Sequence, residues 1–201
     1  MRILRALLLA LAALAAACGD SAKLAPLAPD AVILAFGDSL TFGTGASEAE
    51  SYPAQLESLV GRRVVRAGVP GEVSAQALAR LPGMLEEVRP QLLILCIGGN
   101  DFLRNLGAAQ VEANVRRMVR LAQESGAGVL LIGTPEKGLL LKPPGFYAKL
   151  AKDAGIPYEG DVIGEILRKS ELKSDPIHPN AKGYRLIAER VAERLRKAGA
   201  L

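Results

Sequence analysis

One histidine, His178, stands three residues after Asp175 in the segment Asp-Pro-Ile-His-Pro-Asn, and the 201-residue chain contains no other. An imidazole beside a carboxylate can act as a general base. The carboxylate accepts the Nδ1–H, fixes the ring tautomer and stabilises the imidazolium that forms. An aspartate at this spacing also occurs by chance, so the pair indicates catalysis only if a nucleophile lies within reach.

Ser39, in the Gly-Asp-Ser-Leu segment 37–40, is the nucleophile that we expect. A serine hydroxyl attacks poorly at neutral pH unless a base within hydrogen-bond reach takes its proton. Ser39 directly follows an apolar run, so its hydroxyl would project into a crevice and its backbone N–H would face a developing anion. A serine in this position is more often a simple turn residue, so its role as nucleophile depends on whether other polar segments of the chain converge on it.

Short apolar runs alternate with helical patterns along the chain. The expected strands are 31–36, 63–67, 92–97 and 129–132, with a weaker one at 156–158. The expected helices are 75–88, 111–124, 146–154 and 180–197. The runs lack polar alternation, which is typical of strands buried on both faces. This order predicts an α/β protein, a three-layer α/β/α sandwich with a mostly parallel sheet of five strands.

Polar segments follow the first three strands of this predicted sheet. They are 37–40 (Gly-Asp-Ser-Leu), 68–74 (Gly-Val-Pro-Gly-Glu-Val-Ser) and 98–101 (Gly-Gly-Asn-Asp), while Asp175 and His178 precede the last helix. Ligands of open α/β sheets bind beyond the carboxyl ends of the strands. We therefore expect these four segments to converge on one edge.

These segments resemble the sequence blocks of the GDSL, or SGNH, hydrolase family, over about 32–196, and most of all its bacterial arylesterase, thioesterase and lysophospholipase branch. The resemblance implies a flavodoxin-like SGNH hydrolase fold, with Ser39, His178 and Asp175 as the catalytic triad. It also implies three donors to the oxyanion: the backbone N–H groups of Ser39 and Gly71 and the side-chain amide of Asn100. The chemistry implied uses an acyl-enzyme, no metal and no cofactor.

The sequence also predicts roles for two loop aspartates and for a group of hydrophobic residues. Asp38 and Asp101 are interpreted as structural carboxylates that hold loop backbone. Hydrophobic residues after the third and fourth strands are candidates for an acyl or aryl groove, and the alternative is a loop packed over the core. These pocket candidates are Phe102, Leu103, Leu140 and Phe146.

The first 30 residues differ from the rest. Residues 1–17 combine a basic start with an apolar run that is too short for a permanent span, for which about 20 residues are needed, and they predict a signal peptide. Cys18 is the candidate lipidation site of a bacterial lipoprotein, with 18–30 as lipidated cysteine and tether and 31–201 as the hydrolase domain. Simple secretion is the alternative. The expected location is the cell envelope, anchored to a membrane and facing the periplasm.

The amino-acid composition indicates which kinds of binding partner the chain can have. Lys and Arg number 25, of which Arg2 and Arg5 lie in the leader, against 21 Asp and Glu, so no basic footprint for nucleic acid remains. Cys96, in an apolar run, is expected to be a buried hydrophobe. We expect a monomer that hydrolyses a small-molecule carboxylic ester, including thioesters and lysophospholipids. The alternatives are a carbohydrate O-acetylesterase, an acyltransferase of the envelope, and a non-catalytic envelope lipoprotein.

Overall fold

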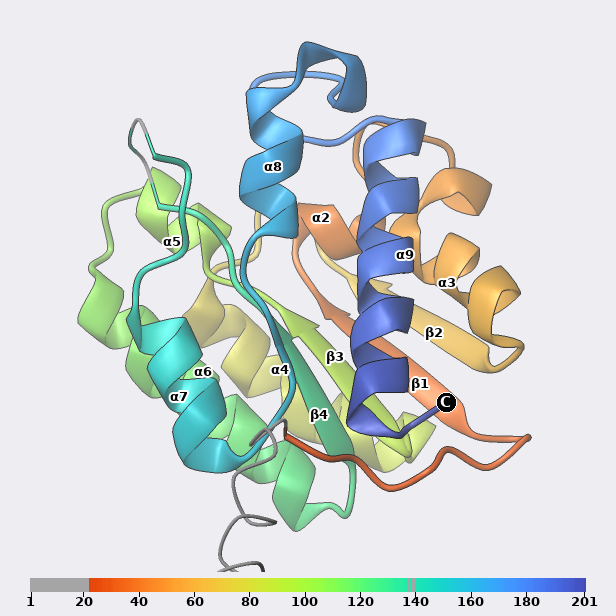
Figure 1. Ribbon diagram of the computed structural model, residues 1–201. Helices are drawn as coiled ribbons and strands as arrows, with labels where there is room; N and C mark the ends of the chain where they lie inside the picture. The colour runs from red at the N-terminus through yellow and green to blue at the C-terminus, as the bar shows by residue number, and fades with distance from the viewer. Residues whose placement is uncertain (1–21, 137, 139) are drawn as a thin grey trace, which may run out of the picture.

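Five parallel strands form the middle layer of the molecule (Figure 1). The computed structural model describes residues 22–136, 138 and 140–201. The strands are β1 (Val32–Gly37), β2 (Arg63–Gly68), β3 (Leu92–Cys96), β4 (Gly128–Ile132) and β5 (Tyr158–Glu159). Their order is β2-β1-β3-β4-β5, so the direction of winding reverses between β1 and β3. A reversal of this kind places the ligand crevice of an α/β sheet at the carboxyl ends of those two strands.

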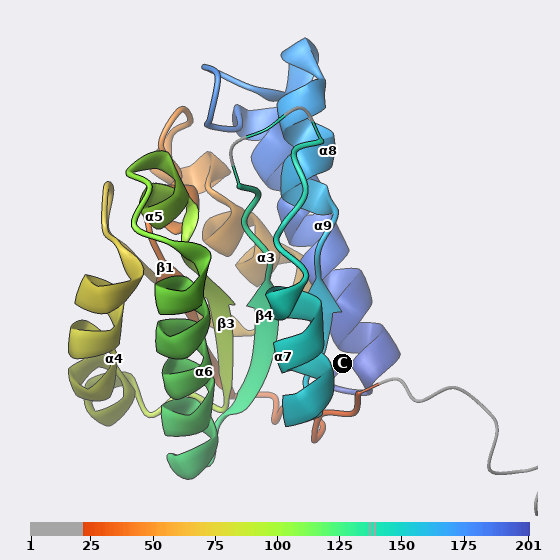
Figure 2. The same ribbon diagram turned by 90° about the vertical axis from the view of Figure 1, so that its left-hand side faces the viewer.

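Helices cover both faces of the sheet, and they are listed here in chain order. They are α2 (Ser39–Phe42), η2 (Glu48–Glu50), α3 (Tyr52–Val60), α4 (Ser74–Val88), α5 (Gly99–Leu103), α6 (Ala108–Glu124), α7 (Phe146–Ala154), α8 (Val162–Arg168), η3 (Ser170–Leu172) and α9 (Ala181–Ala198). Figure 2 shows α4 and α6 on one side of the sheet and α8 and α9 on the other. Helix α7 packs in the same core as α4 and α6. The predicted three-layer sandwich is confirmed.

Strands β1 to β4 each contribute to two hydrophobic cores. In β1, Ile33 and Ala35 pack with α3, α8 and α9, whereas Leu34 and Phe36 pack with α4, α6 and α7. Successive side chains of a strand point to opposite faces, so both faces of this sheet require apolar residues. This accounts for the unbroken apolar runs in the sequence.

Helices α3, α5 and α8 were not among the expected helices, and α3 and α8 are the longest of the three. Pro53 interrupts the helical pattern of α3, but it lies in the first turn, where a missing N–H has no cost. Gly164 lies inside α8 and weakens its helical signal. A Cβ at position 164 would come within 2.1 Å of the Leu141 carbonyl oxygen, so glycine lets the loop after β4 rest on α8.

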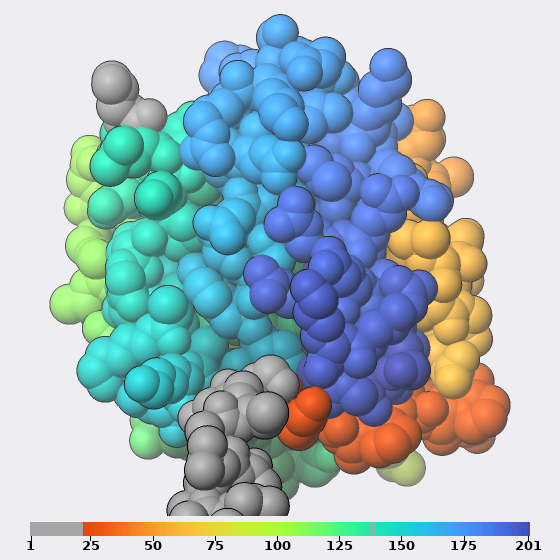
Figure 3. Space-filling view, in the orientation of Figure 1, coloured from red at the N-terminus to blue at the C-terminus, as the bar shows by residue number. Residues whose placement is uncertain are grey.

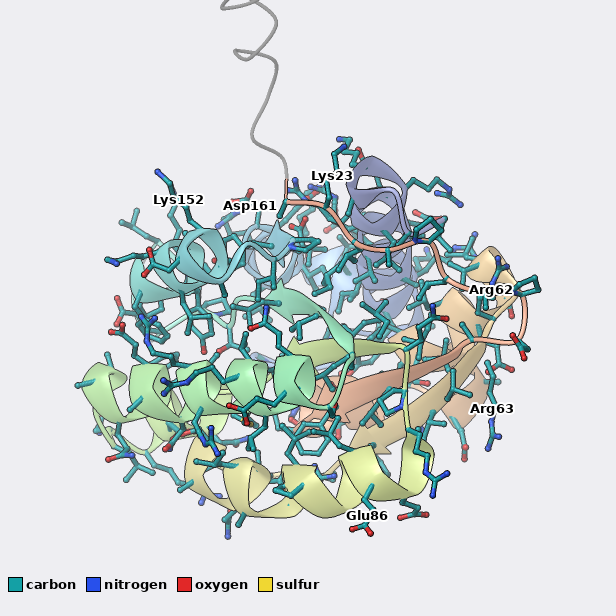
Figure 4. All side chains as sticks on the ribbon, turned by 90° about the horizontal axis from the view of Figure 1, so that it is seen from below. Lys23, Arg62, Arg63, Glu86, Lys152 and Asp161 are labelled. Atoms are coloured by element: carbon teal, nitrogen blue, oxygen red, sulfur yellow. The ribbon has the colours of Figure 1, made fainter. Side chains whose placement is uncertain are left out.

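The stretch expected to be a tether is packed against the domain over residues 24–28. Leu24 N–H donates to Ala198 O at 2.9 Å and Leu27 N–H to Ala200 O at 2.9 Å, and Leu27 is buried. In Figure 3 this orange-red stretch runs beneath the dark blue end of α9. Apolar leucines within the Ala/Pro-rich segment explain the contact. Figure 4 shows charges of both signs around this underside, among them Lys23, Lys152 and Glu86.

The leader lies outside the residues that the structure describes, and so does Cys18. Within the described ranges, no helix has both the length and the hydropathy needed to cross a membrane. Cys96 is buried in β3, as expected.

Candidate active site

The turn between β1 and α2 holds Ser39 at the carboxyl edge of the sheet. A Cβ on Gly37 would lie 2.0 Å from Cys96 O, so only glycine fits between the strands here. Asp38 caps α2, because its Oδ1 accepts the Leu40 N–H at 3.0 Å. Ser39 is the first residue of this short helix, which directs its side chain toward the loop before α9.

The loop that carries His178 is fixed by its own aspartate. Asp175 Oδ1 accepts the backbone N–H groups of Ile177 and His178, each at 2.8 Å. Ser174 N–H donates to His178 O at 2.9 Å and closes the loop. Asn180 then caps α9 by accepting from Lys182 and Gly183. These bonds explain why a six-residue segment can hold an imidazole without a helix or strand around it.

Ser39, His178 and Asp175 form a continuous hydrogen-bonded row. His178 Nδ1 lies 2.7 Å from Asp175 Oδ2, and His178 Nε2 lies 3.0 Å from Ser39 Oγ. The histidine side chain is 15% exposed and the aspartate side chain 43%. Partial burial alone would raise the pKa of Asp175, but hydrogen bonds from His178 and Ile177 outweigh it and lower that pKa. The carboxylate therefore stays charged behind the ring.

Gly71 occupies a tight turn that follows β2. Its φ is +78°, and the Glu72 N–H donates to Val69 O at 3.1 Å across the turn. A proline followed by a glycine of positive φ is the signature of a type II turn. Arg104 donates to the Gly71 carbonyl at 2.9 Å, which fixes the peptide from the other side.

Asn100, near the start of α5, connects this turn to the serine loop. Its Nδ2 donates to Glu72 O at 3.0 Å and to Asp38 Oδ2 at 3.3 Å. Among the described residues, no group accepts from the backbone N–H of Ser39 or of Gly71. The segments after β1, β2 and β3 are thus joined around Asn100, as the convergence argument predicted.

Two buried carboxyl groups support these loops. Burial raises the pKa of Asp38 to about 7, helped by the neighbouring carboxylates of Glu72 and Asp101. Asp101 accepts the backbone N–H of Ser74 at 2.8 Å and its hydroxyl at 2.6 Å. Both aspartates hold loop backbone, in agreement with their structural interpretation.

A cavity opens beside Ser39 and His178, with an empty volume of about 470 Å³ that includes space open to solvent. Its polar wall contains Asp38 and Asn100. Its apolar wall contains Leu40, Leu103, Pro135, Ile163, Leu167 and Ile177. Gly71 lies outside this lining and borders a neighbouring hollow with Gln76 and Arg104.

Of the four expected pocket residues, only Leu103 lines this cavity. Phe102 is buried in the core under α6, because the short helix α5 turns it inward. Phe146 starts α7 and stacks on Tyr147, with ring centroids 4.3 Å apart. Leu140 is 72% exposed and borders a different hollow. Leu140 and Phe146 therefore do not supply the expected wall, although Pro135 at the start of the same loop does line the cavity.

Helix α8 supplies that wall instead, through Ile163 and Leu167. The sequence contained a signal for it, since Val162, Ile163, Ile166 and Leu167 recur at helical spacing directly after the weak fifth strand. Ile177 also lines the cavity and could have been expected from its place between Asp175 and His178.

No three His, Cys, Asp or Glu side chains gather in a possible metal cluster within residues 22–136, 138 and 140–201.

A hydroxyl, an imidazole and a carboxylate in one hydrogen-bonded row, on a doubly wound parallel sheet, have the geometry of the serine hydrolase class. The chain is more narrowly placed by comparison with known proteins. Residues 35–186 match the model of the GDSL-like lipase/acylhydrolase family, and the chain belongs to that family.

Curated relatives carry esterase names. The chain is 31% identical to Esterase TesA of Pseudomonas aeruginosa over 79% of this chain and 85% of that protein. It is 32% identical to thioesterase 1/protease 1/lysophospholipase L1 of Escherichia coli K12, over 81% of this chain and 82% of the relative. An arylesterase of Vibrio mimicus is 29% identical, over 82% and 88% of the two chains. The protein is thus a carboxylic ester hydrolase of the esterase, thioesterase and lysophospholipase kind.

Solved structures agree with this placement. TesA superposes with a TM-score of 0.73 at 28% identity, covering 83% of this chain and 99% of that one. AlinE4, an SGNH-hydrolase family esterase, gives 0.67 at 31% identity over 84% and 96% of the two chains. EstA from Pseudoalteromonas, at 24% identity and a TM-score of 0.74 over 84% and 98% of the two chains, shares the fold.

Proposed function

We propose that the chain hydrolyses short to medium acyl or aryl esters through a covalent acyl-enzyme on Ser39. The observation that carries this proposal is the row of hydrogen bonds from Asp175 Oδ2 through His178 to Ser39 Oγ, at 2.7 and 3.0 Å. The hydroxyl, base and orienting carboxylate are each within the reach that nucleophilic catalysis requires.

In the first half of the reaction, Ser39 Oγ attacks the ester carbonyl carbon while His178 Nε2 takes the hydroxyl proton. The tetrahedral intermediate collapses, the C–O bond to the alcohol breaks, and the imidazolium returns its proton to the departing alkoxide. In the second half, His178 takes a proton from water, whose oxygen attacks the acyl carbon. The intermediate then collapses, the bond from the acyl carbon to Ser39 Oγ breaks, and the imidazolium gives its proton to that oxygen, which releases the carboxylic acid and restores the Ser39 hydroxyl.

Three donors would stabilise the negative oxygen in both halves. They are the backbone N–H groups of Ser39 and Gly71 and the Nδ2 group of Asn100. This assignment is supported by the absence of a described acceptor for either backbone N–H and by the contact between Asn100 and the Gly71–Glu72 turn. Preorganised donors of this kind are commonly the largest single contribution to acyl-transfer catalysis.

The apolar wall of Leu103, Ile163, Leu167 and Ile177 would take the acyl or aryl group. These apolar side chains lie in the same cavity as Ser39 and His178, next to the carbonyl that would be attacked. Thioesters and lysophospholipids remain within the proposal, because the Escherichia coli relative is named thioesterase 1/protease 1/lysophospholipase L1.

We also propose that the mature chain is monomeric and anchored in a bacterial envelope, facing the periplasm, by a lipid on Cys18. The Ala-Ala-Ala-Cys sequence after the apolar leader supports this. Cys18→Ser should move the protein from the membrane fraction to the soluble fraction of the envelope. Unchanged fractionation, or an unmodified Cys18 by mass spectrometry, would contradict the anchor.

The test of the catalytic proposal is a panel of p-nitrophenyl esters, acyl-CoA thioesters and lysophospholipids given to the purified protein and its variants. Ser39→Ala and His178→Ala should lose nearly all turnover of every ester cleaved by the parent. Ser58→Ala is the matched control, since Ser58 is exposed on α3 and outside the cavity. Retention of full ester hydrolysis by a folded His178→Ala protein would refute the mechanism.

A further inference from the structure

Both hydrogens of the Asn100 amide already have acceptors. An Asn NH₂ group has two donors, and here Glu72 O lies at 3.0 Å and Asp38 Oδ2 at 3.3 Å. If Asn100 is to donate to a substrate oxygen, one of these contacts must therefore yield. The resting chain thus keeps the amide occupied until substrate arrives.

The Glu72 contact is the more firmly held of the two. Its acceptor is a backbone carbonyl whose residue closes the type II turn through the Glu72 N–H. The Glu72 side chain is also tied to Arg80, at 2.9 and 2.6 Å. Arg80 in turn donates to Ala67 O at 3.2 Å and lies over the Phe36 ring. Moving Glu72 O would disturb this whole set of contacts.

Asp38 is held differently. It is 2% exposed, lines the cavity with Ser39 and Asn100, and accepts through Oδ1 from Leu40. Within the described part of the chain, no lysine or arginine pairs with it, because Arg80 is engaged by Glu72. Its longer contact with Asn100 is therefore the bond that can be exchanged for one to substrate.

We propose that Asp38 is a positioning residue for the oxyanion site: its Oδ2 holds one N–H of Asn100 toward the cavity until the substrate oxygen replaces it. This inference rests on the proposed role of Asn100 as an oxyanion donor. In it, Glu72 O fixes the plane of the amide and Asp38 fixes which way the second N–H points. The donor is thereby oriented before negative charge develops, which is what makes such a donor effective.

Burial gives this arrangement a physical basis. A carboxyl group without a cation partner in the interior disfavours its charged form, and burial raises the pKa of Asp38 to about 7. At neutral pH such a carboxyl is charged only about half of the time, so on average it accepts hydrogen bonds less strongly than a permanently charged carboxylate does. The bond to Asn100 can therefore be released at low cost.

Asp38→Asn separates positioning from capping. An asparagine oxygen caps a helix as well as an aspartate oxygen does, so the bond to Leu40 is retained. Its NH₂ group would instead face Nδ2 of Asn100, donor against donor, and turn the Asn100 amide away. If Asp38→Asn fails to fold, as judged by thermal unfolding, Asp38→Ser also retains a capping oxygen and serves in its place.

The experiment is a double-mutant cycle on kcat and KM for a p-nitrophenyl ester. Asn100→Ala should lower kcat by about 10²–10³. Asp38→Asn should lower kcat by roughly tenfold to a hundredfold, because a donor displaced by about 1 Å loses most of its effect, with KM nearly unchanged. In the Asn100→Ala background, Asp38→Asn should have almost no further effect on kcat.

Asp101→Asn is the matched control. Asp101 is a buried neighbour that binds Ser74 and not Asn100, so any effect it has should add to that of Asn100→Ala. A kcat loss in Asp38→Asn that persists in the Asn100→Ala background would overturn the positioning role, and so would full activity of folded Asp38→Asn. Full activity of Asn100→Ala would instead overturn the proposed oxyanion role itself.

Discussion

At the scale of single residues, the site depends on two aspartates held in opposite electrostatic states. Asp175 accepts three hydrogen bonds from its own loop, and its pKa is lowered despite partial burial. Asp38 is fully enclosed, and its pKa is raised to about 7. The same type of side chain thus serves as a permanent anion behind His178 and, at neutral pH, as a partly protonated group beside Asn100.

Asp175→Asn should lower kcat by roughly 10³–10⁴ while the protein stays folded. The asparagine oxygen can still accept from Ile177 and His178, but its NH₂ group would face Nδ1 and favour the wrong imidazole tautomer. Steady-state kinetics with circular dichroism would check this. A loss of less than tenfold would show that the carboxylate does not orient the ring.

Activity should fall as the solution becomes acidic. An imidazole that has taken up a proton from solution can no longer accept the proton of Ser39, so the base function of His178 is lost. The measurement is kcat/KM against pH for the parent protein. Activity that stays constant down to pH values where imidazole is fully protonated would contradict His178 as the base.

The stability conferred by Asp38 should decrease as pH rises. Its folded pKa of about 7 lies above the ordinary value of 3.8, so its contribution is complete below pH 4 and lost as the pH rises to 7. Relative to Asp38→Asn, the free energy of unfolding should decline over this window by up to roughly 4 kcal/mol and then level off.

Urea denaturation at several pH values would test this. The facing carboxyls are Glu72 and Asp101, and burial raises the pKa values of Tyr52, Tyr147, Tyr184 and Cys96 in the same interior, which keeps these four neutral in this window. A difference that is constant with pH would mean that Asp38 is not buried as described.

At the scale of elements, the strands and the long helices could be predicted from the sequence because their patterns are dominated by burial. Helix 146–154 was expected with the observed bounds, and strand 63–68 was one residue longer than expected. The polar segments after β1, β2 and β3 were found because they follow strand ends, whereas Asp175 and His178 were found from their spacing just before the last helix. Helix α8 was missed because it is only seven residues long and contains Gly164. A glycine is needed at this position because the backbone of the distant Leu141 packs against it, and that contact cannot be read from the sequence.

Because α8 was not predicted, the residues that line the apolar side of the cavity were also predicted wrongly. An apolar loop in the sequence cannot be distinguished from a lining segment, because orientation depends on what it packs against. Phe146 and Phe102 are drawn inward by the core around α6 and α7, while Leu140 faces solvent. Each polar residue of the site could be recognised from the short motif that contains it, whereas the apolar lining of the cavity depends on tertiary packing.

Leu167→Ala should shift the acyl preference toward longer chains. Removing three carbons from the cavity wall makes room for additional methylenes, and such a change alters relative kcat/KM by about tenfold. A chain-length series of p-nitrophenyl esters would measure it. The control is Leu140→Ala, which is exposed and outside the cavity and should leave the preference unchanged. An unchanged profile for Leu167→Ala would remove α8 from the substrate wall.

At the scale of the whole molecule, the N-terminal stretch and the site lie at opposite edges of the sheet. Leu24 and Leu27 bond to Ala198 and Ala200 at the carboxyl end of α9, whereas His178 precedes the first residue of that helix. An 18-residue helix is about 27 Å long, and this length separates the two regions.

Leu27→Ala should therefore change stability without changing catalysis. Leu27 is 7% exposed, and truncating a buried leucine costs about 2–3 kcal/mol of unfolding free energy where the site is close to the surface. Chemical denaturation would measure the loss, and kcat/KM at a temperature where the variant is folded should match the parent. A reduced kcat/KM in the folded variant would show that the two edges are coupled.

The same separation decides how the molecule could be handled. A chain immobilised on a bead or electrode through its amino end would have the cavity beside Ser39 and His178 facing the surrounding solution. The length of α9 would separate this cavity from the solid surface. Bulky or polymer-bound esters would then remain accessible without an engineered linker.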